Sequence, residues 1–217
     1  MSTLYTNARF WSSGQEIFHD LLVKDSIIIA TGEQTKEFTA ETTIDLNGAF
    51  VIPAFLDGHA HPIFAGREAA GPKINGINSI EEIKAQVKAF ALANPTTPWI
   101  IGGAYEAAII EGGDFDAKWL DEVVSDRPVV LHAVDHHTIW VNSKAIELSG
   151  ITSATKDPQG GTIARNSDGC AKGTLREPSA MALVLNHAPA NTIESDIAAI
   201  TYACAEYRKV GVIAAID

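Results

Sequence analysis

Two histidines, His59 and His61, stand one residue apart directly after the apolar run from residue 51 to 56. Side chains on a strand alternate between its two faces, so both imidazoles are predicted to point the same way and to bind one cation. Asp57 would share that face and could orient a ligand histidine through a hydrogen bond. The spacing therefore predicts a divalent metal centre, with zinc as the expected ion. The alternative, two ordinary polar residues at a strand end, stays open.

The elements that must position this pair are strands and helices in alternation. The run from 51 to 56 is continuously apolar, as in a strand buried on both faces of a parallel sheet or barrel, and Pro62 limits its length. Ser79 and Glu82 form a capping box that opens an amphipathic helix. The alternation from residue 51 onward is typical of βα units. The pattern predicts helices at 79–93, 117–124, 143–148 and from the cap Asn191 to 210, and strands at 99–101, 128–131 and 212–216.

The first 50 residues have a different pattern, in which short apolar segments alternate with polar turns. This pattern predicts a small β domain. Its strands are expected at 8–11, 17–23, 26–30 and 43–46, with the first turn at 12–14.

A glycine-rich stretch spans residues 157–169 and invites comparison with a phosphate-binding loop. It lacks the G-x-x-x-x-G-K-[ST] layout, and the Asn-Ser-Asp-Gly turn at 166–169 favours a β-hairpin. We therefore expect a hairpin, and Trp140 and Asn142 upstream of it are expected to be structural, as a packed aromatic and a helix cap.

Several segments, in order and spacing, resemble the amidohydrolase superfamily, in the branch called amidohydrolase 3. They are the strand ending in His59-Ala60-His61, Trp99 to Gly103, Leu120-Asp121, Arg127 to Leu131, His137 with Trp140 to Ile146, Gly160 to Arg165 and Gly173 to Glu177. Ala54 stands where the family commonly has glycine. The resemblance implies an α/β fold, a partial metal-dependent-hydrolase TIM (β/α) barrel over 51–217 with about four of its strands, preceded by a β-sandwich subdomain over 1–50.

The same resemblance implies roles for two later residues. Glu177 takes the position that a carboxylated lysine fills in other branches, so it is expected to bind metal; the alternative is that it caps the helix after it. His137 is expected to contact substrate, although a structural, hydrogen-bonded histidine remains an alternative. Neither His132 nor His136 is given a functional role. The remaining family ligands and the aspartate that moves protons lie on later strands, so no catalytic residue is assigned here.

The resemblance implies a metal-dependent hydrolase that cleaves a carbon-nitrogen bond other than a peptide bond, in an amide or cyclic amide, with metal-activated water. The alternative function is a truncated, non-catalytic fragment or an interaction module that retains part of the fold.

Composition narrows the partners. The 217 residues carry 16 basic and 27 acidic side chains, a formal net charge of −11, which argues against nucleic acid. No signal peptide and no apolar run near the ~20 residues of a membrane helix is present, so the default expectation is a cytoplasmic protein without a membrane partner. The expected partner is a small amide substrate. Open strand edges favour association, with a homo-oligomer as one expected form. Cys170 and Cys204 predict no disulfide framework.

Overall fold

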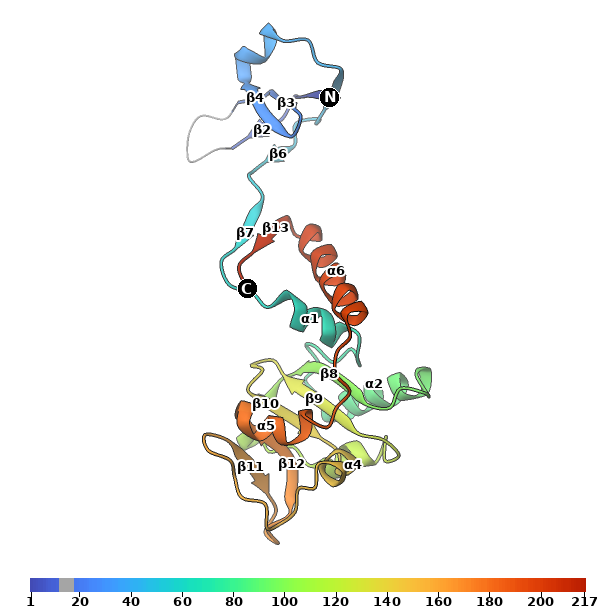
Figure 1. Cartoon of the computed structure of the whole chain (residues 1–217). Coiled ribbons are helices and arrows are strands. Elements are labelled where there is room, and N and C mark those ends of the chain that lie inside the picture. Colours follow the sequence, from blue (N-terminus) through green and yellow to red (C-terminus); the bar gives the residue numbers. More distant parts are fainter. Residues whose placement is uncertain (12–17) are drawn as a thin grey trace. The chain divides into compact units, whose positions relative to one another are not determined.

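The computed structural model describes residues 1–11 and 18–217, and the turn expected at 12–14 lies outside the described residues (Figure 1). The chain forms two compact units. One contains Met1–Gly58 and Arg208–Ile216, and the other contains His59–Tyr207 and Asp217. The domain division expected from sequence, 1–50 and 51–217, stays a prediction.

The first unit contains a four-stranded sheet in the order β4-β3-β1-β5. β1 pairs in parallel with β5 and antiparallel with β3, which in turn pairs antiparallel with β4. Two short strands, β2 and β6, pair in parallel beside it. The strands expected at 26–30 and 43–46 are confirmed, and the one expected at 17–23 begins only at Leu21, with residue 17 outside the described residues. The sandwich stays a prediction. The elements are β1 (Ser2–Thr6), β2 (Arg9–Phe10), β3 (Leu21–Lys24), β4 (Ile27–Thr31), the 3-10 helix η1 (Gly32–Glu37), β5 (Thr42–Asp45) and β6 (Phe50–Val51).

A parallel strand pair, β7 (Phe55–Asp57) and β13 (Val212–Ala215), completes this unit. The prediction of one continuous strand buried on both faces is wrong here, because the run is interrupted at 52–54 and Leu56 is 72% exposed. Pro53 has no backbone N–H for a ladder, and β7 pairs within the described residues with β13 alone. Phe55, at the start of β7, is 54% exposed as well. The strand expected near 212–216 is confirmed.

The second unit is built on a five-stranded sheet in the order β11-β12-β10-β9-β8. Only β8 and β9 pair in parallel, and the other three pairs are antiparallel. The expected strands at 99–101 and 128–131 exist, but they join a mixed sheet rather than successive barrel positions. The expectation of about four barrel strands is thus corrected to a mixed α/β fold without a closed barrel among the described residues. The strands are β8 (Ile100–Tyr105), β9 (Val129–Ala133), β10 (Thr138–Val141), β11 (Thr162–Arg165) and β12 (Ala171–Arg176).

The helices largely follow the sequence signals. Ser79 accepts a hydrogen bond from the Glu82 backbone at 3.4 Å, which confirms Ser79 as the cap of this helix, whereas the reciprocal half of the capping box stays a prediction. The predicted Asn191 cap is wrong, because Thr192 accepts from Ser195 N at 3.1 Å while Ser195 Oγ accepts from Thr192 N at 3.0 Å. This reciprocal pair of hydrogen bonds provides acceptors for two backbone N–H groups at the start of the helix. The helices are α1 (Pro62–Ala69), α2 (Ile80–Ala93), η2 (Ala107–Ile109), η3 (Glu111–Gly113), α3 (Ala117–Asp121), α4 (Ser143–Leu148), α5 (Glu177–Leu185) and α6 (Ile193–Lys209).

The stretch from 157 to 169 forms the expected hairpin between β11 and β12. Asn166 N donates to Cys170 O at 2.9 Å, and Gly169 N donates to Asn166 O at 2.9 Å. Gly169 has φ +84°, a left-handed conformation that glycine adopts without a steric cost. The turn chemistry was therefore a reliable local signal.

The core of the second unit is aromatic. Tyr105, Phe115 and Trp140 are fully buried, with the Phe115 ring 4.7 Å from Tyr105 and 4.9 Å from Trp140 between centroids. Trp140 Nε1 donates to Asp116 O at 3.0 Å, so its polar edge is satisfied. The structural role expected for Trp140 agrees with this packing. Among the described residues, no helix has the length and apolar character needed to cross a membrane.

Candidate functional site

The His59 and His61 rings lie beside each other in the second unit. Their centroids are 4.9 Å apart and their planes meet at 81°, an edge-to-face arrangement. Strand alternation does not produce this, because β7 ends at Asp57 and His61 already occupies the position before α1. The turn into the helix brings the two imidazoles together instead.

A carboxylate fixes the second of these rings. His61 Nδ1 lies 2.8 Å from Asp217 Oδ1, with the two side chains 46% and 54% exposed. A carboxylate on one ring nitrogen selects the tautomer and directs the other nitrogen, Nε2, toward a cation. Two imidazoles, one oriented in this way, match the ligand types that zinc and similar divalent ions take. The residues therefore fit a bound metal.

Asp57 is the last residue of β7 and belongs to the first unit. Its backbone carbonyl accepts from Ile216 N at 3.0 Å. The role predicted for its carboxylate, orienting a histidine ligand, stays a prediction.

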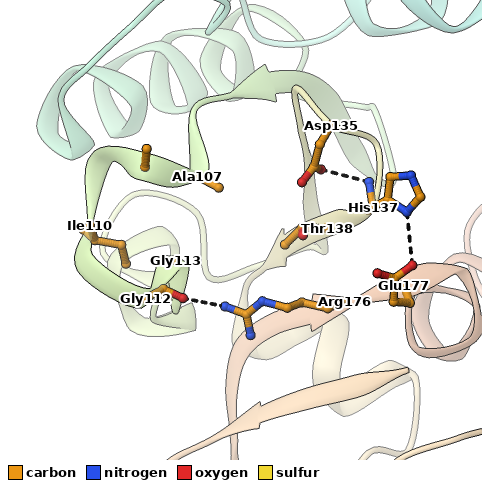
Figure 2. A pocket seen from close by; sticks show the side chains of 10 residues that line it. Ala107, Ile110, Gly112, Gly113, Asp135, His137, Thr138, Arg176 and Glu177 are labelled. Atoms are coloured by element: carbon orange, nitrogen blue, oxygen red, sulfur yellow. Dashed lines mark hydrogen bonds and ion pairs between the residues drawn. The ribbon is translucent and has the colours of Figure 1, made fainter. Parts of the chain in front are cut away.

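The two other residues singled out from sequence, His137 and Glu177, meet in a pocket (Figure 2). His137 Nδ1 lies 3.1 Å from Glu177 Oε2, and the Glu177 backbone N donates to His137 O at 2.7 Å. Asp135 Oδ1 accepts from the His137 backbone N at 2.9 Å. The pocket is about 400 Å³ in volume. The loop after β9 and the start of α5 therefore position one histidine against one carboxylate.

The electrostatics of this pair follow from its geometry. The hydrogen bond to Glu177, and then its negative charge, raise the pKa of His137 above its ordinary value. Arg176 forms the pocket wall, with Nη2 2.8 Å from Gly112 O and 2.6 Å from Asp114 Oδ1. His137 therefore carries a proton over a wider pH range than a free imidazole.

Glu177 itself has a strained backbone, with φ +69° at a non-glycine residue. Such conformations cost on the order of 1 kcal/mol and persist where the surroundings enforce them. Glu177 begins α5, and its carboxylate contacts His137. Its assignment as a metal ligand stays a prediction, as does the substrate contact of His137.

Three residues that sequence reasoning passed over form a further cluster. Glu68, His132 and His136 each offer one potential ligand atom, and these atoms all lie within 4.8 Å of one another. Glu68 comes from α1, His132 from β9, and His136 from the turn after β9. The His-x-x-x-His spacing was a visible signal, but the carboxylate 64 positions before His132 was not. Tertiary packing alone brings it there.

Burial shapes the charges in this cluster. Desolvation raises the pKa of Glu68 to about 7. Burial, followed by the charge of His136, lowers the pKa of His132 to about 4. All three residues line a cavity of about 560 Å³. At neutral pH His132 is therefore an unprotonated imidazole, the form that binds metals.

Comparison with known proteins identifies the class. A model of the amidohydrolase family matches residues 42–217. YtcJ of Bacillus subtilis (strain 168) is 35% identical over 173 residues, which cover 77% of this chain and 32% of that protein. The N-substituted formamide deformylase of Arthrobacter pascens is 28% identical over 167 residues, 74% of this chain and 31% of that enzyme. The chain belongs to the amidohydrolase family, as its motifs predicted.

A solved structure shares the fold. The crystal structure of an uncharacterized metal-dependent hydrolase from Pyrococcus furiosus superposes with a TM-score of 0.66 at 21% identity, covering 99% of this chain and 44% of that one. The chain spans about a third of the length of the curated relatives it matches.

Proposed function

We propose that the protein is a metal-dependent hydrolase of carbon-nitrogen bonds other than peptide bonds, acting on small amides or cyclic amides. The observation that carries the proposal is the His59 and His61 pair, 4.9 Å apart, with His61 held by Asp217. Membership of the amidohydrolase family supports hydrolysis as the reaction class. The bond type, zinc as the metal and a cytoplasmic location belong to the proposal.

His59 and His61 would hold the cation, and Asp217 would keep His61 in the tautomer that binds. A bound divalent cation supplies Lewis-acid polarisation and lowers the pKa of water to near neutrality. His61 contributes a neutral imidazole nitrogen, and the Asp217 carboxylate retains the proton on the opposite ring nitrogen. No general base is assigned to this chain.

His137 would bind substrate in the pocket of Figure 2, which Glu177 also lines. The raised pKa of His137 keeps the ring able to donate a hydrogen bond, which suits an amide carbonyl oxygen. Arg176, fixed by Asp114 at 2.6 Å, keeps the wall in place. In this proposal His137 orients the substrate. Glu177 holds His137 through their 3.1 Å contact, and its role as a metal ligand is the one that the sequence predicts.

A small amide is the substrate class that the observations favour. The pocket volume of about 400 Å³ suits a small molecule rather than a polymer. One relative is named for removing formyl groups from N-substituted formamides. The net charge of −11 argues against a nucleic-acid partner.

The test is turnover by the full-length natural polypeptide with Zn²⁺ present. We would assay N-acyl amides, N-substituted formamides and cyclic amides and follow release of the amine. His61→Asn should reduce kcat/KM by at least about 100-fold, whereas His187→Ala, which removes an exposed imidazole elsewhere, should not. Equal turnover by wild type and His61→Asn would refute the proposal.

A non-catalytic interaction module is the second candidate, and one observation favours it. Phe55 on β7 and Ile213 on β13 are 54% and 70% exposed, so this parallel pair presents apolar side chains to solvent. Self-association through these strands would make a homo-oligomer. Light scattering and the amide assay together separate the candidates: a wild-type protein that is oligomeric, becomes monomeric with Phe55→Ser and turns over no amide supports the module.

A further inference from the structure

We propose that Glu68, His132 and His136 form a second divalent transition-metal site, separate from the His59 and His61 pair. Its ligands would be one carboxylate oxygen and two imidazole nitrogens. This combination leaves a coordination position for water or a small ligand from the adjoining cavity. The inference does not depend on the proposed hydrolase reaction.

The donor atoms are already close enough. Three atoms within 4.8 Å of one another can each lie within about 2.8 Å of a common point, so shifts below about 1 Å reach the 2.0–2.2 Å distances of zinc sites. Side-chain rotation supplies shifts of this size without a change in the backbone. Two imidazoles and one carboxylate suit zinc and its neighbours in the first transition row, whereas Mg²⁺ and Ca²⁺ prefer oxygen ligands alone.

One oxygen of the Glu68 carboxylate has no hydrogen-bond partner in the described part of the chain. Its Oε1 is buried and makes no hydrogen bond there, and His136 Nδ1, the ionic neighbour, lies 3.5 Å away. The Glu68 side chain is only 16% exposed. Burying a carboxylate without hydrogen bonds is costly, and a cation at this point would remove that cost. The Glu68 carboxylate lies close to both His132 and His136, with ligand atoms within 4.8 Å of one another.

The backbone conformation at Gly103 and His136 helps to place two of the three ligands, Glu68 and His136. A Cβ at Gly103 on β8 would collide with the Glu68 carboxylate, so the absence of a side chain there makes room for it. His136 has φ +58° at a non-glycine position, and its N donates to Ala133 O at 3.0 Å. A residue with a Cβ is uncommon in the left-handed region, although histidine is among those that adopt it more often. The tight turn brings His136 back toward His132, with ring centroids 6.4 Å apart.

The site opens on a cavity and stands apart from His61. All three ligands line the cavity of about 560 Å³, together with Phe64 and Arg67. The Phe64 ring lies 5.8 Å from the His61 ring and 5.9 Å from the His136 ring, measured between centroids. One aromatic side chain therefore touches both candidate centres. The two can be emptied independently by substitution.

Calorimetric titration with Zn²⁺ alone tests the proposal. The background is the intact chain with His59→Asn and His61→Asn, which removes the other centre. We expect this background protein to bind one Zn²⁺ ion. Glu68→Gln or His136→Gly should lower the affinity for that ion by at least about 100-fold. His136→Gly is chosen because glycine adopts φ +58° without a steric cost, so the variant should fold at least as well.

His187→Ala is the matched control, since it removes an exposed histidine outside the cluster, and it should leave the affinity for that ion unchanged. Circular dichroism of every variant checks the fold, and Co²⁺ absorption provides a second readout that should lose intensity with the same variants. Binding that is absent from the background protein overturns the proposal. Binding that Glu68→Gln and His136→Gly both leave intact overturns it equally. Because the background lacks His59 and His61, neither outcome bears on the proposed hydrolase function.

Discussion

The imidazole of His61 and the carboxylate of Asp217 meet at 2.8 Å, although 156 positions of sequence separate them. His61 precedes α1, and Asp217 follows β13, which pairs with β7 just before the histidines. The residues directly after these two paired strands, Asp217 after β13 and the histidines after β7, therefore follow segments that run side by side. The contact supports the metal hypothesis with a carboxylate that orients His61, which the spacing of the two histidines does not reveal.

Replacing Asp217 by Asn should weaken zinc binding at His59 and His61 by about 10- to 100-fold. The amide keeps the shape of the carboxylate but loses the charge that favours the binding tautomer of His61. Zn²⁺ calorimetry in the His136→Gly background measures this centre alone. Asp126→Asn, an exposed carboxylate near Arg127, is the control and should have no effect. An unchanged affinity in Asp217→Asn would show that the contact does not serve the metal.

Replacing Glu177 by Gln should lower the pKa of His137, because the hydrogen bond and the negative charge that raise it are lost. The raised pKa stabilises the fold at pH values below the ordinary histidine pKa, and this contribution disappears as pH rises through the folded-state pKa. Glu177→Gln should therefore destabilise the protein at pH 5 more than at pH 8. Titration of the His137 ring by NMR measures the shift directly. A His137 pKa equal in both proteins would contradict the pairing.

Glu68→Gln should stabilise the metal-free protein, and increasingly so as pH rises. Burial raises the pKa of Glu68 from 4.5 to about 7, so ionisation opposes folding from about pH 4.5 upward and its full cost is reached above pH 7. At about 1.4 kcal/mol per pKa unit, the gain at pH 8 is at most about 3.5 kcal/mol. His132 titrates in both proteins, so its effect cancels in the comparison. Urea unfolding with a chelator at pH 4 and pH 8 checks this; an equal difference at the two pH values would refute it.

Asn142→Ala should cost about 3 kcal/mol or more of unfolding free energy. The sequence identified Asn142 as a helix cap, and its Oδ1 does accept from Ala145 N at 3.0 Å. The same oxygen also accepts from Val129 N, and Nδ2 donates to Val124 O and Arg127 O, all near 3 Å; the first two of these bonds are buried and the third is partly buried. Chemical denaturation measures the loss. Asn191→Ala, at the cap position that Thr192 occupies instead, should change stability by less than about 0.5 kcal/mol.

Local features were predictable from the sequence because their causes are local. Ser79 and Glu82 identify the start of α2, and the turn at 166–169 identifies the hairpin. Pairing between strands was not predictable. The apolar runs that became β8 and β9 have the same appearance in a parallel barrel and in a mixed sheet, and only the antiparallel return of β10 against β9 decides between them.

The candidate sites divide in the same way. His59 and His61 were visible because two residues apart in sequence remain neighbours in space. The Glu68, His132 and His136 cluster was missed because its carboxylate comes from a helix 64 positions before His132. Asp217, the partner of His61, was equally invisible. A site assembled across elements depends on tertiary packing, for which spacing along the chain carries no signal.

The most direct test of the account is the affinity of the His59 and His61 pair for zinc. Calorimetry would compare the His136→Gly protein with the same protein carrying His59→Asn and His61→Asn, at neutral pH with Zn²⁺ as the only divalent ion. We predict one equivalent in the first protein and its loss in the second, with circular dichroism unchanged. The same binding in both would contradict the assignment of these two histidines as metal ligands.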